Sequence, residues 1–154
     1  REGMVRLYPY YGATSVVDYV DAYIFDGVYI LISEDGANVV DALGHPLIQY
    51  TYGKFWVNNH AHVLIPRENC DIEYANAFFR ILDMQEFVSG TTRLKLTQSK
   101  MKKIPVVLPS IELQKEFAAF VKQSDKSKFG KEMCDRWILE IQNSWYQIYR
   151  ILHQ

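Results

Sequence analysis

The sequence holds one pair of side chains whose types and spacing suit chemistry: His60 and His62, separated by a single alanine. Side chains on a strand alternate between its two faces, so these two imidazoles would point to the same side. Such a pair could ligate a metal ion, or one histidine could act as a general base. Zinc needs three or four ligands, however, and the other histidines and cysteines lack ligand-like spacing. We therefore interpret Asn59, His60 and His62 as scaffold residues near a tight turn, and a histidine-based enzyme as the least favoured hypothesis.

A second candidate for chemistry is a cluster of cations in the second half of the chain. Between Phe87 and Ile111 the sequence has no acidic residue. Five basic residues, which we call the basic stripe, fall within eleven positions of that stretch: Arg93, Lys95, Lys100, Lys102 and Lys103. A stripe of this density suits contacts with phosphate groups, although many charge runs are only solvated surface.

The remaining sequence carries no recognisable catalytic signature. It has no phosphate-binding glycine loop, no nucleophile elbow and no Cys/His nucleophile pattern, and its carboxylates are dispersed. An enzyme would therefore have to use residues in no recognisable catalytic arrangement, so the residues alone disfavour one.

The elements that would position these residues differ between the two halves. The first seventy residues favour short strands with frequent turns. We predict strands over residues 28–33, 47–52 and 60–65, and a further hairpin from residues 15–20 and 23–25. Asp26-Gly27 and Asp35-Gly36 are turn signals on either side of the first of these strands. Eight of the eleven tyrosines lie in the first 52 residues, where they suit either a half-buried strand or a binding surface.

The second half favours helices. Asp71 is typical of an N-cap, and the apolar spacing predicts a helix over residues 72–87. Residues 104–109 contain two prolines and can form only a short edge strand. A further helix begins at Ser110, and an apolar stripe continues towards the end of the chain. Its two tryptophans pack either on their own domain or against a partner helix.

Composition limits the class of protein. A chain of 154 residues with 49% hydrophobic and 23% charged residues is typical of one globular domain, without a membrane-length apolar run. Two cysteines are too few for a disulfide framework, so we expect a cytoplasmic protein. The net charge of −1 conceals an asymmetry: residues 1–86 hold five Lys/Arg against twelve Asp/Glu, and residues 87–154 hold twelve against six.

A series of motifs also carries a resemblance to a known family. In chain order they include Tyr10-Tyr11-Gly12-Ala13-Thr14, Phe25-Asp26-Gly27, Ser33-Glu34-Asp35-Gly36, Gly53-Lys54-Phe55-Trp56-Val57-Asn58-Asn59-His60-Ala61-His62, Ser89-Gly90-Thr91-Thr92-Arg93-Leu94-Lys95 and Glu112-Leu113-Gln114. This series resembles the target-recognition domain of type I restriction-modification specificity subunits, from about Tyr8 to Lys128. Several motifs in the expected order make the resemblance specific.

The resemblance implies a fold of the α+β class. Residues 1–109 would form a β-rich target-recognition domain of short twisted strands with a packed helix, lacking its first strand. Residues 110–154 would form a helical spacer or dimerisation region. Such subunits are non-catalytic DNA readers that usually have two recognition domains, and their long helices pair antiparallel. Methyltransferase subunits dock alongside and a motor-nuclease subunit can join. The methyl donor and ATP belong to those partners, so the resemblance implies that the chain itself holds no cofactor and no metal.

The resemblance also assigns roles to residues. The basic stripe would contact phosphates of double-stranded DNA. Bases would be selected by loop side chains, for which the candidates are Tyr10, Tyr11, Thr14, Lys54, Asn58 and Arg93. Tyr10 and Tyr11 could instead simply pack, and Asn58 could cap a turn. A partner helix would be contacted by Phe117, Val121, Met133, Trp137, Ile141, Trp145 and Ile148.

Two readings of the whole chain remain open. With one recognition domain instead of two, the chain would be a half-subunit or a fragment, and a half-subunit could homodimerise through its C-terminal helices. The alternative is a truncated interaction remnant, which dimerises or binds the methyltransferase through its helices without reading DNA.

Overall fold

We describe a computed structural model of the chain, which covers residues 6–36 and 39–124. Its contacts divide the chain into two compact units. Unit 1 contains residues 1–65 and 83–104, and unit 2 contains residues 66–82 and 105–154. The predicted domain boundary at residue 109 stays a prediction, although unit 2 groups residues 66–82 with the residues that follow position 104.

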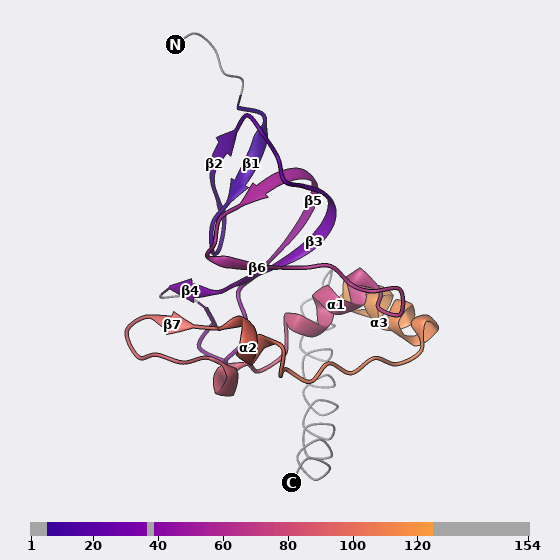
Figure 1. Cartoon of the computed structure of the whole chain (residues 1–154). Helices are drawn as coiled ribbons and strands as arrows, with labels where there is room; N and C mark the ends of the chain where they lie inside the picture. Colours follow the sequence, from indigo (N-terminus) through magenta and orange to yellow (C-terminus); the bar gives the residue numbers. More distant parts are fainter. Residues whose placement is uncertain (1–5, 37–38, 125–154) are drawn as a thin grey trace, which may run out of the picture. The chain divides into compact units, whose positions relative to one another are not determined.

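Unit 1 is built on a five-stranded mixed sheet with the order β2-β1-β5-β3-β6 (Figure 1). The strands are β1 (Tyr8–Tyr11), β2 (Val16–Val20), β3 (Phe25–Ser33), β5 (Ile48–Val57) and β6 (Ala61–Leu64). β1 runs parallel to β5, and every other pair in the sheet is antiparallel. A separate two-stranded sheet joins β4 (Asp35–Gly36) to β7 (Leu94–Lys95). The mixture of this sheet and helices confirms the predicted α+β class.

The core of the sheet surrounds one phenylalanine. Phe55 is fully buried, and the rings of Tyr11, Phe25 and Tyr29 lie 5.2–5.5 Å from its centroid. The alternation of β3 places Phe25, Tyr29 and Leu31 on this face, and Leu31 joins the same buried cluster. Aromatic pairs at these distances add to the stabilisation that comes from burial alone.

The opposite face of the sheet has a buried and an open part. On β3, Ile30 and Ile32 are buried to 1% and 0% exposure, whereas Val28 nearer the start of the strand is exposed. Tyr52 of β5 lies opposite Val28 in the ladder and is 79% exposed. The rest of unit 1 contributes further buried apolar side chains, which include Met84, Leu96 and Ile104. This face is therefore buried along the second half of β3 and open near the start of the strand.

Two expectations for the β half were wrong. Residues 15–20 and 23–25 do not pair: β2 pairs with β1, and Phe25 begins β3 and pairs with Phe55 of β5. Asp26-Gly27 is not a turn but lies inside β3, where Gly27 sits opposite Gly53. Both glycines have positive φ, 142° and 75°, which an L side chain rarely adopts. A pair of glycines thus lets both strands distort without breaking the ladder, so β5 runs to Val57.

Unit 2 pairs the two helices α1 (Ile72–Phe79) and α3 (Ile111–Ser124). Asp71 caps α1 as predicted, because its carboxylate accepts a hydrogen bond from the Tyr74 amide at 2.9 Å. Tyr74 packs edge-on against Phe117 of α3 with centroids 5.6 Å apart. Phe117, a predicted partner-helix residue, therefore has an aromatic neighbour inside its own unit.

One buried side chain organises the chain around both helices. Gln114 is fully buried and accepts a hydrogen bond from the Asp71 amide at 2.8 Å. Its amide nitrogen donates to the carbonyl oxygens of Asn69 and Pro109, at 2.9 Å and 2.8 Å. One glutamine thus satisfies two backbone groups that lie 43 and 45 residues before it in the sequence and a third that lies five residues before it.

Two expectations for the helical half were also wrong. The helix predicted over residues 72–87 ends at Phe79, and residues 85–87 form only a short 3-10 helix, η1 (Gln85–Phe87). The chain leaves the helix because Met84 is fully buried in unit 1, where its amide donates to the Gly44 carbonyl. Residues 104–109 form no strand; they lead into α3, and Val107 accepts a hydrogen bond from a side chain of α1. The four-residue helix α2 (Gln98–Met101), capped by Thr97, was not anticipated.

The tyrosine that donates this bond provides a test of unit 2. Burial raises the pKa of Tyr74 to about 12, and its hydroxyl donates to the Val107 carbonyl at 2.7 Å. The protonated hydroxyl of Tyr74 makes its full contribution to the free energy of unfolding below the ordinary tyrosine pKa near 10. This contribution is lost as the pH rises through the higher pKa of the folded state. Tyr74→Phe should lower the unfolding free energy by about 1 kcal/mol at neutral pH, because a carbonyl loses its donor.

Urea unfolding at neutral and at alkaline pH would measure both effects. The variant should lose less stability than the native chain when the pH is raised from near 10 to about 12. Tyr52→Phe, which removes an exposed hydroxyl, serves as the matched control. Equal pH dependence in the native chain and the Tyr74 variant would contradict the assignment.

Candidate nucleic-acid interface

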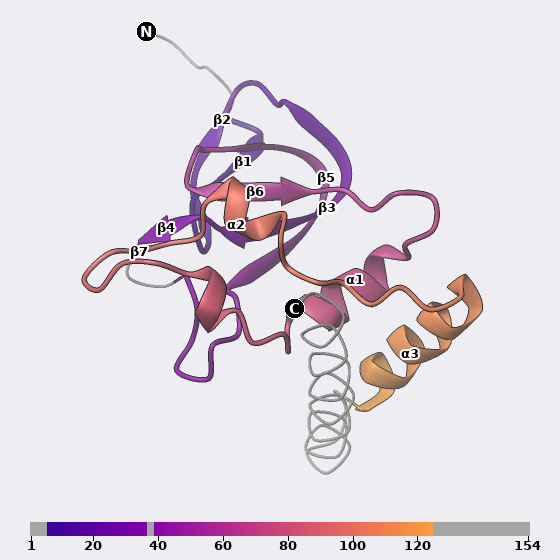
Figure 2. The ribbon, with the colours of Figure 1, turned by 60° about the horizontal axis from the view of Figure 1, so that its bottom comes forward.

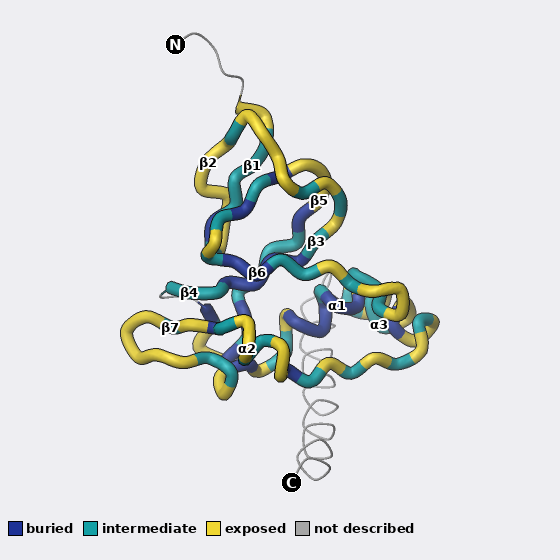
Figure 3. Tube along the Cα trace, in the orientation of Figure 1, coloured by how far each residue is buried: buried dark blue, intermediate teal, exposed yellow. Residues whose placement is uncertain are grey.

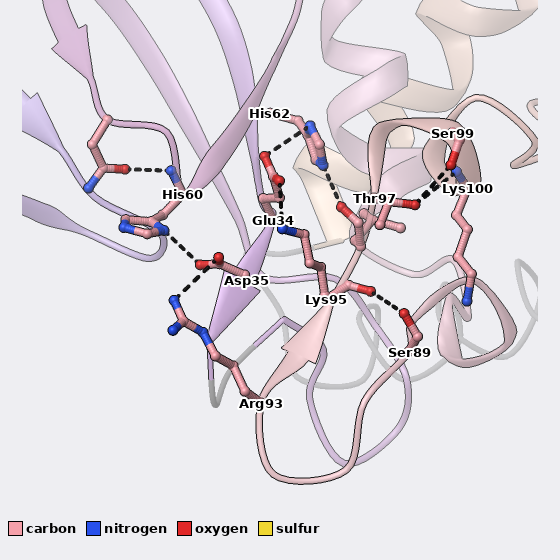
Figure 4. A network of polar contacts seen from close by, with 12 residues as sticks. Glu34, Asp35, His60, His62, Ser89, Arg93, Lys95, Thr97, Ser99 and Lys100 are labelled. Atoms are coloured by element: carbon pink, nitrogen blue, oxygen red, sulfur yellow. Dashed lines mark hydrogen bonds and ion pairs between the residues drawn. The ribbon is translucent and has the colours of Figure 1, made fainter.

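The most connected polar site in unit 1 joins three segments that are distant in sequence. Glu34 and Asp35 lie between the histidines near β6 and the cations of β7 (Figure 4). The backbone brings them together, because the Glu34 amide donates to the His60 carbonyl and the Leu96 amide donates to the Glu34 carbonyl. We call Glu34, Asp35, His60, His62, Arg93 and Lys95 the acid–base network.

Asp35 bridges one histidine and one cation of this network. Its Oδ1 lies 2.7 Å from Nδ1 of His60, and its Oδ2 accepts a hydrogen bond from Arg93 at 3.3 Å. Burial raises the pKa of Asp35, but the hydrogen bond from His60 and the charges of His60 and Arg93 outweigh it, so the pKa lies below its ordinary value. Asp35 is therefore an ionised anchor for both groups.

Glu34 bridges the second histidine and the second cation in the same manner. Its two carboxylate oxygens lie 3.6 Å from Nζ of Lys95 and 3.8 Å from Nδ1 of His62. His62 is buried, and its Nε2 lies 2.7 Å from the Leu96 carbonyl oxygen. Because a carbonyl oxygen only accepts, Nε2 of His62 carries the proton. His62 thus holds the chain next to β7 in place.

The contacts of the two histidines agree with their interpretation as scaffold residues. The His60 amide donates to the Asn58 side chain at 2.9 Å, so Asn58 closes the turn before β6. Among the described residues, no group of three or more His, Cys, Asp or Glu side chains could hold a metal ion.

The helices in the described ranges also include none long and apolar enough to cross a membrane.

The loop before β7 presents Arg93 to solvent. Residues 89–93 are exposed, and the loop extends away from the five-stranded sheet (Figures 2 and 3). Ser89 and Lys95 close its base with two backbone hydrogen bonds, of 3.0 Å and 2.7 Å. Gly90 has φ 101°, and a Cβ there would collide with the Arg93 carbonyl oxygen. The turn therefore requires glycine at this position.

The structure divides the basic stripe into two groups. Arg93 and Lys95 are each paired with a carboxylate of the acid–base network. Across the described part of the chain, no ion pair involves Lys100, Lys102 or Lys103, which lie in and just after α2. Lys102 and Lys103 are exposed and Lys100 is half-buried. These three lysines are the uncompensated positive charges of the stripe.

The other predicted base-contacting residues lie elsewhere in unit 1. Tyr11 packs on Phe55, and burial raises the pKa of its hydroxyl. Tyr10 is half-buried in β1, and Thr14 is exposed in the loop that follows. Lys54 is exposed on β5, with Nζ 4.6 Å from the centre of the Tyr23 ring. Within the described residues, Asn58 and Arg93 are the two of the six candidates that hydrogen-bond to the acid–base network.

Five of the seven predicted partner-helix residues lie outside the described residues: Met133, Trp137, Ile141, Trp145 and Ile148. Val121, on α3, is half-buried.

Sequence reasoning missed Glu34 and Asp35 as site residues. Asp35-Gly36 was interpreted only as a turn, whereas it forms β4. The sequence does contain a signal, because two adjacent acids, Glu34 and Asp35, are followed by two pairs with one residue between them: His60/His62 and Arg93/Lys95. No spacing rule, however, states that these three runs meet.

These features define a type of α+β module. A basic loop beside a mixed sheet is held by an acidic and histidine-containing support, and the chain also has a two-helix unit. Comparisons with known proteins identify the family to which the chain belongs. The family model described as type I restriction modification DNA specificity domain matches residues 4–132. The chain belongs to this family.

Individual relatives agree with the family. Over 108 residues, 70% of the chain, it is 37% identical to a Haemophilus influenzae protein assigned as a type I restriction enzyme specificity subunit. Over 119 residues, 77% of the chain, it is 26% identical to the specificity subunit of the type I restriction enzyme EcoprrI from Escherichia coli. The chain covers only 27% and 28% of these two proteins.

A solved structure has a similar fold. The crystal structure of the S subunit of a type I restriction-modification system from M. genitalium matches 77% of the chain with a TM-score of 0.60. The sequences are 14% identical, and the match covers 32% of that structure. At this identity the likeness concerns the fold alone.

Proposed function

We propose that this chain reads a specific sequence in double-stranded DNA as the specificity component of a type I restriction-modification system. The observation that carries the proposal is the family match over residues 4–132. It is supported by the position of the basic stripe, which lies on exposed loops and the short helix α2 of unit 1.

The charges of the stripe suit two tasks in DNA binding. Uncompensated lysines supply salt-dependent affinity for phosphates, which carries little sequence information. Lys100, Lys102 and Lys103 have this character. Cations held by carboxylates are restrained in direction, which favours contacts with particular atoms of the base edges. Arg93 and Lys95 have this second character.

The chain would work with other subunits and perform no catalysis of its own. Methyltransferase subunits, and with them a motor-nuclease subunit, would bind the methyl donor and ATP, so the chain itself would need no cofactor. The C-terminal helices would provide the contact with the methyltransferase or with a second copy of the chain. A cytoplasmic location follows for a protein that acts on the DNA of its own cell.

Selection from a random duplex pool would test DNA reading directly. The full chain, alone and with its methyltransferase subunit, should enrich one short sequence, and its affinity should fall as salt rises. Enrichment of no sequence in either form would refute the proposal. Binding to the methyltransferase without enrichment would instead favour the interaction remnant.

A further inference from the structure

One guanidinium of the acid–base network has both a fixed support and a free edge. The Arg93 side chain is 68% exposed, and one of its terminal nitrogens donates to Asp35. A guanidinium has five N–H donors in a rigid fork, so several donors remain after this bond. No other arginine belongs to the basic stripe. Arg93 therefore differs from the four lysines in shape as well as in support.

The support behind Arg93 consists of a chain of restrained groups. Asp35 is only 15% exposed and uses one oxygen for His60 and the other for Arg93. His60 is in turn fixed through its backbone amide, which donates to Asn58 at 2.9 Å. Each link removes freedom from the next, so the guanidinium loses less entropy when it binds a planar partner.

The loop backbone supports the same conclusion. Gly90 allows a tight turn, and the two hydrogen bonds between Ser89 and Lys95 fix both ends of the loop that carries Arg93. Planar groups with two adjacent acceptors match the fork of an arginine, and guanine presents O6 and N7 in the major groove in this way. A phosphate contact would not need such support, because a free lysine supplies it.

We propose that Arg93 reads a guanine of the DNA target through two parallel hydrogen bonds to O6 and N7, and that Asp35 and His60 are positioning residues for its guanidinium. This inference rests on the proposed function, since it names the base that one side chain of the reader selects. It predicts that the target contains a guanine whose recognition depends on Arg93 and on Asp35.

Selection and competition binding with variants of the full chain would test the assignment. Arg93→Lys keeps the charge and removes the fork, so it should lower the preference for one G·C base pair by roughly 5- to 150-fold. Asp35→Asn should lower the preference at that same base pair several-fold and leave the preferences at the other positions unchanged. Folding of each variant would be checked by circular dichroism.

An exposed aspartate outside the acid–base network offers a matched control. Asp21→Asn makes the same substitution at an exposed position of unit 1 that contacts neither Arg93 nor its support, so the preference for the guanine should persist. A selected target without guanine, or an unchanged preference in Arg93→Lys, would overturn the inference while the proposed function stands. A loss that is uniform over all sequences, with a smaller salt slope, would assign Arg93 to a phosphate and overturn it too. Enrichment of no sequence by the native chain would overturn both proposals.

Discussion

Replacing Lys100, Lys102 and Lys103 together by glutamine should weaken binding to duplex DNA on the order of 10²-fold near physiological salt, with little change in sequence preference. These three lysines are the stripe cations without an ion pair in the described part of the chain. Each phosphate contact contributes about 0.9 to the slope of log K against log salt. Their removal should therefore lower that slope by about 2.7. Titrations at several salt concentrations would measure both quantities.

A control with the same change in net charge separates local contacts from a general charge effect. Arg80, Lys115 and Lys122 are exposed cations of unit 2, and their joint replacement by glutamine removes three positive charges. This control should leave most of the slope in place. An equal loss in both triple variants would show that net charge alone, and not the position of the stripe, determines the affinity.

Replacing Gln114 by leucine should destabilise unit 2 by roughly 2–5 kcal/mol, although the two side chains are similar in size. The buried amide of Gln114 serves the Asp71 amide and the carbonyls of Asn69 and Pro109, and leucine can serve none of them. Each backbone group left without a partner costs about 1–3 kcal/mol where water cannot replace it. Urea unfolding monitored by circular dichroism would measure the loss of helix stability.

Two further variants define what this result means. Gln123→Leu makes the same substitution at an exposed position of α3 and should change stability little. Gln114→Glu keeps the acceptor but places a carboxylate against two carbonyl oxygens, so it should also be destabilising. If Gln114→Leu were as stable as Gln123→Leu, the three hydrogen bonds would contribute nothing to the unit.

Periodicity and turn chemistry account for the elements that could be predicted. The strand around Ile30 and the N-cap at Asp71 follow from local patterns of apolar residues and capping groups. The failures have tertiary causes. The predicted helix from residue 72 continued past Phe79 because the apolar spacing continues, but burial of Met84 in unit 1 draws the chain away. At Gly27, a turn signal and a distorted strand require the same residue type.

The candidate site was predictable only in its separate parts. The basic stripe and the histidine pair are visible as runs in the sequence, and Arg93 is one of the six candidates for base contacts. The pairing of Asp35 with both His60 and Arg93 depends on the register of β4 against β7 and on the turn before β6. No local pattern encodes those two relations. The ion pairs of Arg93 and Lys95 with carboxylates are therefore known only from the structure. The same holds for the three hydrogen bonds of Gln114 to backbone groups.

The segments of the two units alternate along the sequence, and this limits how DNA recognition can be transferred from one protein to another by recombination. Residues 66–82 of unit 2 interrupt unit 1, so the chain passes between the units three times before α3. A hybrid joined at a single point between residues 66 and 88 would combine parts of both units from two parents. The loop of Arg93 would then meet the acids and histidines of one parent while belonging to the other. A specificity exchange made by recombination should therefore keep residues 34–35, 58–62 and 89–97 from one source.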